Sequence, residues 1–485
     1  MTSMEFAQKW QNKSPLIRRI ATWQESLWYP IVYALLCAIA GLHSKRVYLP
    51  IIGVMALLTL FSALFVRDKK VFLPPMFMSF CSLGCDNVEF TRDGQRVNVV
   101  DVFDTDALVC FCLIGAVMLL ALLIRFSKDC SMLDAFRQQA TFLYGLLAIS
   151  AAIILNGVFS AKWRPVDTAL GLFLAFGFVF IYCLVYSMIK DSHDIAAYTC
   201  FCMVCTALLV VVQVAVTVLR LHEQELLIHY YETLPPRLRR ENLQLAWGYA
   251  TNVAGVVVLG IPAALYLAKN KRHPIVYCLL AILFWATSVV LGTRSAFLVG
   301  ALVLLTCISL ACLKGRNAKI LRLVSIIMIL SGILFLLYAD EKLFSLHELA
   351  DQLLNFLRLD NLDELDRFGL WINGWNDFLE SPLFGVGFSD GGVDVKTEVS
   401  NLFADMYHNV VIEFLGAMGA VGMLAFLWHV KDLLVCLFRR FSVNKLLLLL
   451  LPFTILATSL ADNFFFYINF QLFYCPFLIL AERES

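Results

Sequence analysis

The sequence Arg367-Phe-Gly-Leu-Trp371-Ile-Asn-Gly-Trp375-Asn-Asp-Phe378 is followed by Ser381-Pro-Leu-Phe-Gly385-Val-Gly387-Phe and, after a polar interval, by His408-Asn409-Val-Val-Ile-Glu413-Phe-Leu-Gly416-Ala-Met-Gly419-Ala-Val-Gly422. This stretch carries arginine, histidine, asparagine and glutamate in a chain made mostly of apolar runs. Ionisable side chains are costly in a bilayer, so those that are kept there usually serve a function. We therefore take 367–422 as the region around which the chain is organised.

Composition sets the class of the protein. The chain has 485 residues, of which 60% are hydrophobic and 15% are charged, and its mean hydropathy is +0.78. These values are too apolar for an ordinary soluble protein and indicate a polytopic membrane protein. The net charge of +1 and the scatter of basic residues among loops give no reason to expect a nucleic-acid partner.

Apolar runs of about 20 residues can cross a bilayer as helices. Fourteen candidate spans are present: 27–43, 47–66, 71–84, 106–126, 139–158, 166–189, 195–219, 248–268, 273–292, 295–313, 319–338, 407–429, 445–462 and 464–481. The third span is short, and it is kept because omitting it would move the later Lys and Arg pairs to the outer side. The predicted fold is an all-α bundle of about 12–14 transmembrane helices.

The distribution of basic residues predicts the orientation. With the N-terminus inside, the inner segments carry 23 of the 38 Lys and Arg residues, which satisfies the positive-inside rule and places both termini in the cytoplasm. We divide the chain into four parts: N-terminal helices with outer loops 85–105 and 220–247 (1–247), a transmembrane core (248–338), an outer loop with short helices (339–406), and C-terminal helices (407–485). The outer loop 339–406 is the largest extramembrane segment.

Local patterns predict structure within that outer loop. Apolar residues recur at a helical period among the acids of 341–366, which is typical of an amphipathic helix on a membrane surface. Trp371, Trp375 and Phe378 recur at i, i+4 and i+7 and predict a helix with its aromatic residues on one face, ended by a turn at Pro382 and 385–387. Further on, Gly416, Gly419 and Gly422 predict a smooth face for close helix packing.

Two arginines are candidates for binding an anion. Arg294 lies between two spans with almost no loop, so it is held at the outer membrane boundary, and Arg367 begins the aromatic helix on the same side. If both face one cavity, their planar guanidinium groups suit a diphosphate. The alternatives are a snorkelling anchor for Arg294 and, for Arg367, a salt bridge to one of three nearby acids, Asp363, Glu364 or Asp366.

His408 begins the span 407–429 and is a candidate general base, because an imidazole can take a proton near neutral pH. Its alternative role is that of a hydrogen-bonded interfacial residue. Glu413 is turned from it by about 140° on a continuous helix, so we expect it to pack against neighbouring helices and not to orient His408 directly.

The cysteines lie mostly in apolar runs, where thiols pack as small hydrophobic groups. Cys202 and Cys205 have a CxxC spacing without a second ligand pair in a loop, so membrane packing is favoured over a metal site. Cys81 and Cys85 are expected to be free thiols, since residues at i and i+4 of a helix seldom reach disulfide geometry.

In their order, these motifs resemble the O-antigen ligase and polymerase superfamily. The resemblance rests on Gly-Thr-Arg294-Ser-Ala between two spans, on Arg367 with its aromatic helix and Ser-Pro-Leu-Phe-Gly-Val-Gly-Phe turn, and on His408-Asn409 before the glycine-spaced run. Gly248-Tyr-Ala-Thr-Asn252 adds a weaker likeness upstream. Together these motifs cover about 248–430.

The resemblance implies a glycosyltransferase of the bacterial inner membrane with its active site facing the periplasm. Such enzymes move a glycan from undecaprenyl diphosphate to a hydroxyl group, without a nucleotide sugar, a cofactor or an obligatory metal. Arg294 and Arg367 match the family's essential arginines, and His408 matches its essential histidine. Asn409 is expected to orient the acceptor or to cap the span. Membrane lipids are the other expected partners.

The long N-terminal part and the loop 220–247 depart from the shorter family members. Arg237, Arg239 and Arg240 in that loop could hold lipid headgroups or the donor diphosphate. The acceptor is open: a polymerase uses a second lipid-linked glycan, a ligase uses lipid A core, and related enzymes use a protein hydroxyl. Chain length and the number of spans favour the polymerase. The alternative from a different class is a lipid-linked sugar transporter or flippase, although no inverted repeat is apparent.

Overall fold

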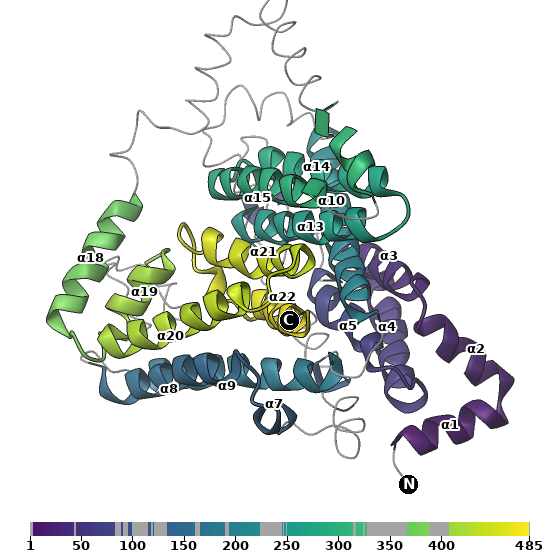
Figure 1. The fold of residues 1–485 in the computed structure, drawn as a ribbon, viewed down its shortest axis with the longest axis horizontal. Helices are drawn as coiled ribbons and strands as arrows, with labels where there is room; N and C mark the ends of the chain where they lie inside the picture. The colour runs from purple at the N-terminus through teal and green to yellow at the C-terminus, as the bar shows by residue number, and fades with distance from the viewer. Residues whose placement is uncertain are drawn as a thin grey trace, which may run out of the picture. The chain divides into compact units, whose positions relative to one another are not determined.

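A computed structural model describes the residue ranges 3–42, 45–82, 89–90, 96–98, 115–117, 120, 133–160, 165–189, 194–223, 245, 247–248, 250–313, 317–323, 325–326, 366–387 and 407–484. Helices make up nearly all of this part of the chain (Figure 1), which confirms the all-α class. Two short antiparallel strands, β1 (Glu89–Phe90) and β2 (Arg96–Asn98), lie inside the predicted outer loop 85–105.

Four helices of the described part are long and apolar enough to cross a membrane: α9 (Pro165–Ile189), α10 (Ile195–Glu223), α13 (Ala250–Asn270) and α20 (Gly419–Phe438). Six further helices contain shorter apolar stretches: α3 (Trp28–Leu42), α4 (Lys45–Phe65), α8 (Leu143–Phe159), α14 (Pro274–Val290), α15 (Arg294–Leu313) and α21 (Val443–Thr458). These helices indicate a multi-pass membrane protein. Most of the predicted spans 106–126 and 319–338, and all of the amphipathic segment 341–365, lie outside the described residues.

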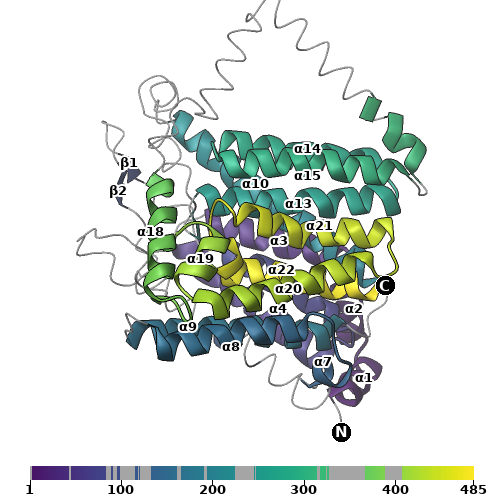
Figure 2. The same cartoon turned by 60° about the vertical axis from the view of Figure 1, so that its left-hand side comes forward.

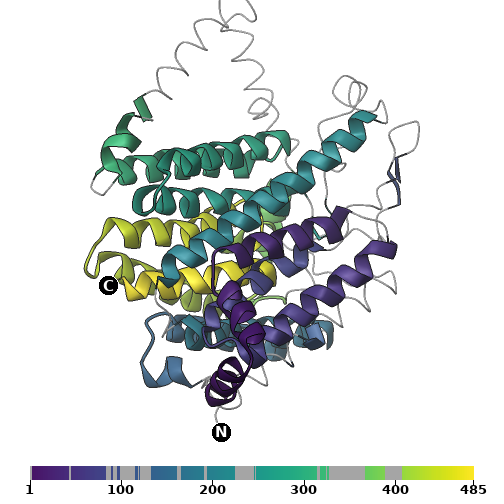
Figure 3. The same ribbon diagram turned by 90° about the vertical axis from the view of Figure 1, so that its right-hand side faces the viewer.

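The chain divides into two compact units. The first contains residues 1–134, 184–267 and 279–300. In it, α3 packs against α4 and α10 (Figure 3), and two N-terminal helices, α1 (Ser3–Lys13) and α2 (Pro15–Gln24), precede α3. Gln213 of α10 is fully buried, donates to the carbonyl of Cys81 at 2.6 Å and accepts from the indole of Trp247 at 3.2 Å.

The predicted third span, 71–84, differs from a continuous helix. Residues 69–82 form η1 (Lys69–Phe72), α5 (Leu73–Met78) and η2 (Ser79–Ser82) in succession. Pro74 and Pro75 are the second and third residues of α5, and each lacks the backbone N–H group that a longer helix would need there. The side chains of α5 are nonetheless all buried.

The second unit contains residues 135–183, 268–278 and 301–485. In it, α8 packs along α20, α21 packs on α22 (Ile468–Arg483), and α18 (Asp366–Glu380) packs on the short helix α19 (Val410–Gly416). Phe414, Phe426 and η4 (Phe464–Phe466) form an aromatic core between these helices. Figure 2 shows α18 lying across the direction of α8 and α20, at one end of them. Residues from this end form the candidate site.

The predicted span 407–429 is broken in two. α19 ends at Gly416 and α20 begins at Gly419, so the long apolar helix is 419–438. Gly419 has a φ of +64°, which L residues rarely adopt, and a Cβ there would lie 2.5 Å from the carbonyl carbon of Leu383. The three spaced glycines therefore do not share one helix face, because Gly419 allows the chain to bend and a neighbouring loop to approach.

Candidate active site

His408 lies in the connection that leads into α19, next to a carboxylate. Its Nδ1 is 3.1 Å from Oδ1 of Asp462, which follows the C-terminus of α21. The imidazole is 41% exposed, whereas the Asp462 side chain is 7% exposed. Within the described part of the chain, Nε2 has no hydrogen-bond partner. Asp462 thus holds the imidazole in one orientation, and Nε2 of the same ring is left to accept a proton, as general-base catalysis requires.

The backbone at His408 is in an uncommon conformation, with a φ of +52°. The neighbouring residue Tyr407 is fully buried and is held at both ends. Its backbone N–H donates to Glu413 Oε2 at 3.0 Å, and its hydroxyl donates to Asp377 Oδ2 of α18 at 2.7 Å. Such strain persists only where surrounding contacts fix the backbone, and it is frequent at functional sites.

Asn409 is the N-cap of α19. Its Oδ1 accepts from the backbone N–H groups of Val411 at 2.9 Å and Ile412 at 3.3 Å. Its Nδ2 donates to the carbonyl of Leu460 at 3.0 Å. Asn409 therefore caps the helix, as one of its two predicted roles required, and also ties it to the segment that carries Asp462. The acceptor-orienting role stays a prediction.

Glu413 supports both members of the histidine–aspartate pair through their chain neighbours. It is fully buried, and its Oε2 accepts from Tyr407 N and, at 2.8 Å, from Nδ2 of Asn463. Oε1 has no partner. Burial raises the pKa of Glu413 to about 7, against the lowering effects of these two hydrogen bonds and of nearby His408. The prediction that Glu413 packs among helices without contacting His408 agrees with this geometry.

The turn 381–387 interlocks with the α19–α20 junction. As predicted, α18 ends just before Pro382, at Glu380. Backbone hydrogen bonds join the two segments in both directions: Val386 N to Gly416 O (3.0 Å), Gly387 N to Ala417 O (3.1 Å), Ala420 N to Pro382 O (2.8 Å) and Val421 N to Leu383 O (3.2 Å). Asn156 of α8 donates to the carbonyls of Phe384 (2.8 Å) and Ala417. The glycines of the turn thus allow backbone-to-backbone contact beside the site.

The helix predicted over 367–379 is present as α18, and its packed face is small and polar. Gly374 meets the ring of Tyr407 and the side chain of Ile412, and Asp377 is buried beside it. Large apolar side chains are exposed along the outer face at Phe368, Ile372, Trp375 and Leu379. Their spacing of three or four residues forms an apolar stripe that the described part of the chain leaves uncovered.

The predicted arginines are described to different extents. Arg294 begins α15 after a three-residue turn, which agrees with the short connection that was predicted, and the residue is half-buried in the first unit. Arg367 lies in the first turn of α18 in the second unit, and its side chain lies outside the described residues. Arg237, Arg239 and Arg240 also lie outside them. Convergence of the arginines on His408 therefore stays a prediction.

Sequence reasoning missed Asp462, which it assigned to the end of a span. The available signal was the polar pair Asp462-Asn463 between the apolar runs 445–462 and 464–481, at the same predicted side as His408. The thiols of Cys81, Cys202 and Cys205 are buried, and Cys85 lies outside the described part of the chain.

The geometry can be compared with known proteins. The family model described as O-antigen ligase matches residues 278–427, a segment that contains Arg294, Arg367, His408 and the junction between α19 and α20. A search of curated proteins gave no match. Residues 278–427 are thus similar to the O-antigen ligase family, which agrees with the resemblance that the order of the motifs indicated.

Proposed function

We propose that this protein transfers a glycan from a lipid diphosphate to a hydroxyl group, with His408 as the general base. The observation that carries the proposal is the His408–Asp462 pair. Donation from Nδ1 to the carboxylate leaves the lone pair on Nε2, the ring nitrogen that has no hydrogen-bond partner within the described residues. Asp462 then holds the ring in position and stabilises the imidazolium that forms, as in other base–orienter pairs.

In the proposed step, one bond forms, one bond breaks and one proton is transferred. The acceptor oxygen attacks the anomeric carbon and forms the new glycosidic bond, while its proton passes to Nε2 of His408. The bond between that carbon and the diphosphate oxygen breaks, and the lipid diphosphate leaves with the electron pair. Arg294 and Arg367 are proposed to hold this diphosphate, because guanidinium groups bind phosphate oxygens in pairs and remain charged at neutral pH.

We propose undecaprenyl diphosphate as the carrier and the periplasmic face of the bacterial inner membrane as the location. The exposed apolar stripe of α18 supports a site at the membrane surface, since this helix lies across one end of α8 and α20 (Figure 2). A helix in the interfacial plane with its apolar side in the lipid would stand beside the headgroup of a lipid-linked donor. The arginines at 237, 239 and 240 are proposed to assist donor binding.

Among acceptors, a second lipid-linked repeat is favoured, which would make the protein a polysaccharide polymerase. Lipid A core, as for an O-antigen ligase, and a protein hydroxyl are the alternatives. The decisive assay uses the purified full-length protein with lipid-linked repeats, with and without lipid A core. Products that increase by one repeat without added acceptor support the polymerase, and product formed only on lipid A core supports the ligase.

The same assay tests the role of His408 in a matched pair of variants. His408→Asn keeps a residue type that tolerates positive φ but removes the base, and we expect turnover to fall by about 10²–10⁴-fold. His273→Asn is the control, because His273 is also exposed and has a φ of +64°. Full activity in His408→Asn would refute the base. Absence of product in the wild type, with lipid-linked sugar still bound, would favour transport.

Arg294 gives a separate test of diphosphate binding. Lysine keeps the charge but loses the planar fork, so Arg294→Lys should be nearly as damaging to turnover as Arg294→Ala. Wild-type turnover in the lysine variant would show that charge alone is enough and would contradict paired binding of phosphate oxygens.

A further inference from the structure

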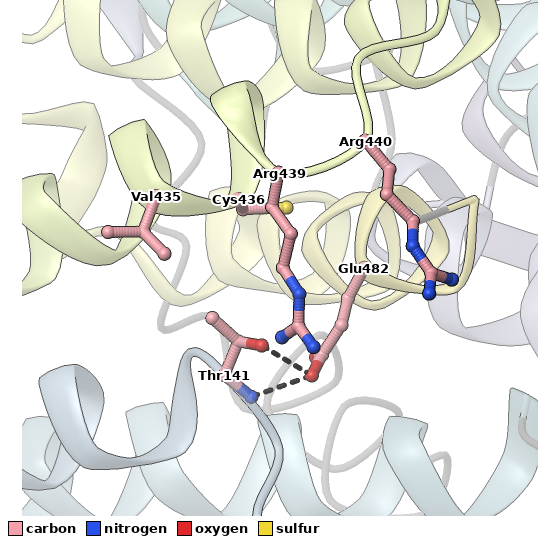
Figure 4. Close-up of a pocket in the computed structure, with 6 residues that line it drawn as sticks. All are labelled: Thr141, Val435, Cys436, Arg439, Arg440 and Glu482. Atoms are coloured by element: carbon pink, nitrogen blue, oxygen red, sulfur yellow. Dashed lines mark hydrogen bonds between the residues drawn. The ribbon is translucent and has the colours of Figure 1, made fainter.

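A second polar site lies in the same unit, at the other end of α20 from His408. It is a pocket of about 210 Å³ lined by Thr141, Val435, Cys436, Arg439, Arg440 and Glu482 (Figure 4). Arg439 and Arg440 follow the C-terminus of α20, Thr141 precedes α8, and Glu482 is in the last turn of α22. The pocket is therefore built where three helices end or begin, and one of them, α20, is long and apolar enough to cross a membrane.

Arg439 and Arg440 are fixed at the backbone but open at the side chain. Arg439 is the C-cap of α20, its carbonyl accepts from the buried Lys445 Nζ at 2.5 Å, and Arg440 has a φ of +49°. Both side chains are exposed, and within the described residues neither guanidinium has a hydrogen bond or an ion pair. Figure 4 shows both extending alongside the last turn of α22. Two adjacent guanidinium groups thus offer unused donors on one pocket.

The carboxylate of Glu482 is already occupied by other partners. Its Oε1 accepts from both the backbone N–H and the hydroxyl of Thr141 at 2.7 Å, as drawn in Figure 4, and its Oε2 accepts from Tyr182 at 3.4 Å. Two arginines and one glutamate leave the pocket with a net charge of +1. A ligand with a single negative charge would balance this charge, whereas a dianion would place its second charge near Glu482.

The surface around the two arginines is apolar. Val435, Phe438 and Phe441 are 48%, 74% and 59% exposed, so the sequence Phe438-Arg-Arg-Phe441 sets two charged groups between two exposed aromatic rings. A free anion would gain nothing from these rings. A lipid would gain from both, because its phosphate can reach the guanidinium groups while its glycerol and acyl carbons cover the aromatic side chains.

We infer that this pocket binds the phosphodiester of a phospholipid with one net negative charge. Arg439 and Arg440 contact the phosphate oxygens, Thr141 and Glu482 fix the far wall, and the aromatic rings contact the acyl region. The site is independent of the proposed transfer reaction and of the His408 end.

The test uses the purified full-length protein in nanodiscs of phosphatidylglycerol or of phosphatidylcholine. Thermal unfolding should occur about 4 °C higher in phosphatidylglycerol, since a ligand that binds only the folded state raises Tm. Arg439→Gln/Arg440→Gln should lose most of that shift. Arg18→Gln/Arg19→Gln is the matched control, because it removes two adjacent exposed arginines from α2 and should keep the shift. Native mass spectrometry should show one retained phosphatidylglycerol in the wild type and in the control.

Three outcomes would overturn the inference. Equal shifts in the wild type and in Arg439→Gln/Arg440→Gln would show that lipid acts elsewhere. Equal losses in both double variants would show a diffuse charge effect. A third arm adds inorganic phosphate to protein in phosphatidylcholine: a shift that appears there, is lost in Arg439→Gln/Arg440→Gln and is absent with phosphatidylglycerol would assign the pocket to a soluble phosphate.

Discussion

The two ends of the second unit differ in how their polar groups are satisfied. At the His408 end, Tyr407, Asn409, Glu413 and Asp462 all have hydrogen-bond partners, and the loop is tied to α18 and to the chain after α21. At the Arg439 end, the backbone is held in a similar way, but two guanidinium groups have no partner within the described residues. The side chains at the His408 end are held in place by contacts within the protein, whereas the two guanidinium groups at the Arg439 end can bind a ligand.

This difference follows from the two kinds of work proposed. A general base must be held close to one geometry, because misplacement lowers the rate steeply. The contacts around His408 supply that rigidity, and the open atom is Nε2 alone. A headgroup site needs only charge and reach, so flexible arginine side chains on a fixed backbone are enough. Each of the following predictions tests how rigid the His408 end is.

The largest effect is expected for Asp462→Asn. The variant retains a polar side chain but loses the charge that stabilises the imidazolium, so kcat should fall by roughly 10²-fold with little change in KM. Asp377→Asn is the control, since it changes a buried carboxylate that contacts Tyr407 and not the imidazole. Steady-state kinetics on both variants would check this. If kcat fell equally in the two, Asp462 would have a structural role only.

A large loss of stability is expected for Gly385→Ala. Gly385 has a φ of +73°, and a Cβ would lie 2.3 Å from the carbonyl group of Ala417. Gly292→Ala is the control, because Gly292 has a φ of +63° with nothing within 4 Å of a Cβ. We expect about 1 kcal/mol for the control and about 3 kcal/mol for Gly385→Ala. Unfolding in detergent would measure both, and equal losses would show that the interlocked turn can relax.

The pH dependence of stability should report on Glu413. The pKa of Glu413 is about 7 in the folded protein, from an ordinary value of 4.5. The folded state therefore holds the proton more tightly, and stability falls as pH rises from about 4.5 through 7, by roughly 3 kcal/mol at most.

Glu413→Gln isolates this contribution from those of the other ionisable groups at this end, His408, Asp462, Asp377 and Tyr407. Glutamine resembles the protonated acid, so its melting temperature should depend less on pH than that of the wild type over pH 5–8. Identical pH profiles for the two proteins would refute the assignment to Glu413.

The smallest effect is expected for Asn409. Asn409→Asp keeps the oxygen that caps α19 but loses the donor to Leu460, and Asn409→Ala loses both. Stability should fall by about 1 kcal/mol in the alanine variant and by less in the aspartate variant. Thermal unfolding and steady-state kinetics would be measured together. A fall in turnover with stability unchanged would instead support the role in orienting the acceptor.

Local patterns predicted some features well. The period of the aromatic residues at 371, 375 and 378 gave α18, and Pro382 with the glycine pair gave the turn that ends it. The period did not predict which face would be buried, and the structure shows that Gly374 and Asp377 are buried while Trp375 is exposed. Periodicity reports which side chains share a face, but not which face meets another helix.

The sequence by itself determined the membrane class, the helical fold and the short list that contains Arg294, Arg367 and His408, because apolar length and costly charges can be recognised residue by residue. Only the tertiary structure decided that 407–429 bends at Gly419, that Asp462 lies 3.1 Å from His408, and that two arginines share a pocket with Glu482. These facts depend on contacts between segments distant in the chain. The approach of Leu383 to Gly419 leaves no local signal in either segment, and the polar pair Asp462-Asn463 does not by itself indicate that it contacts His408.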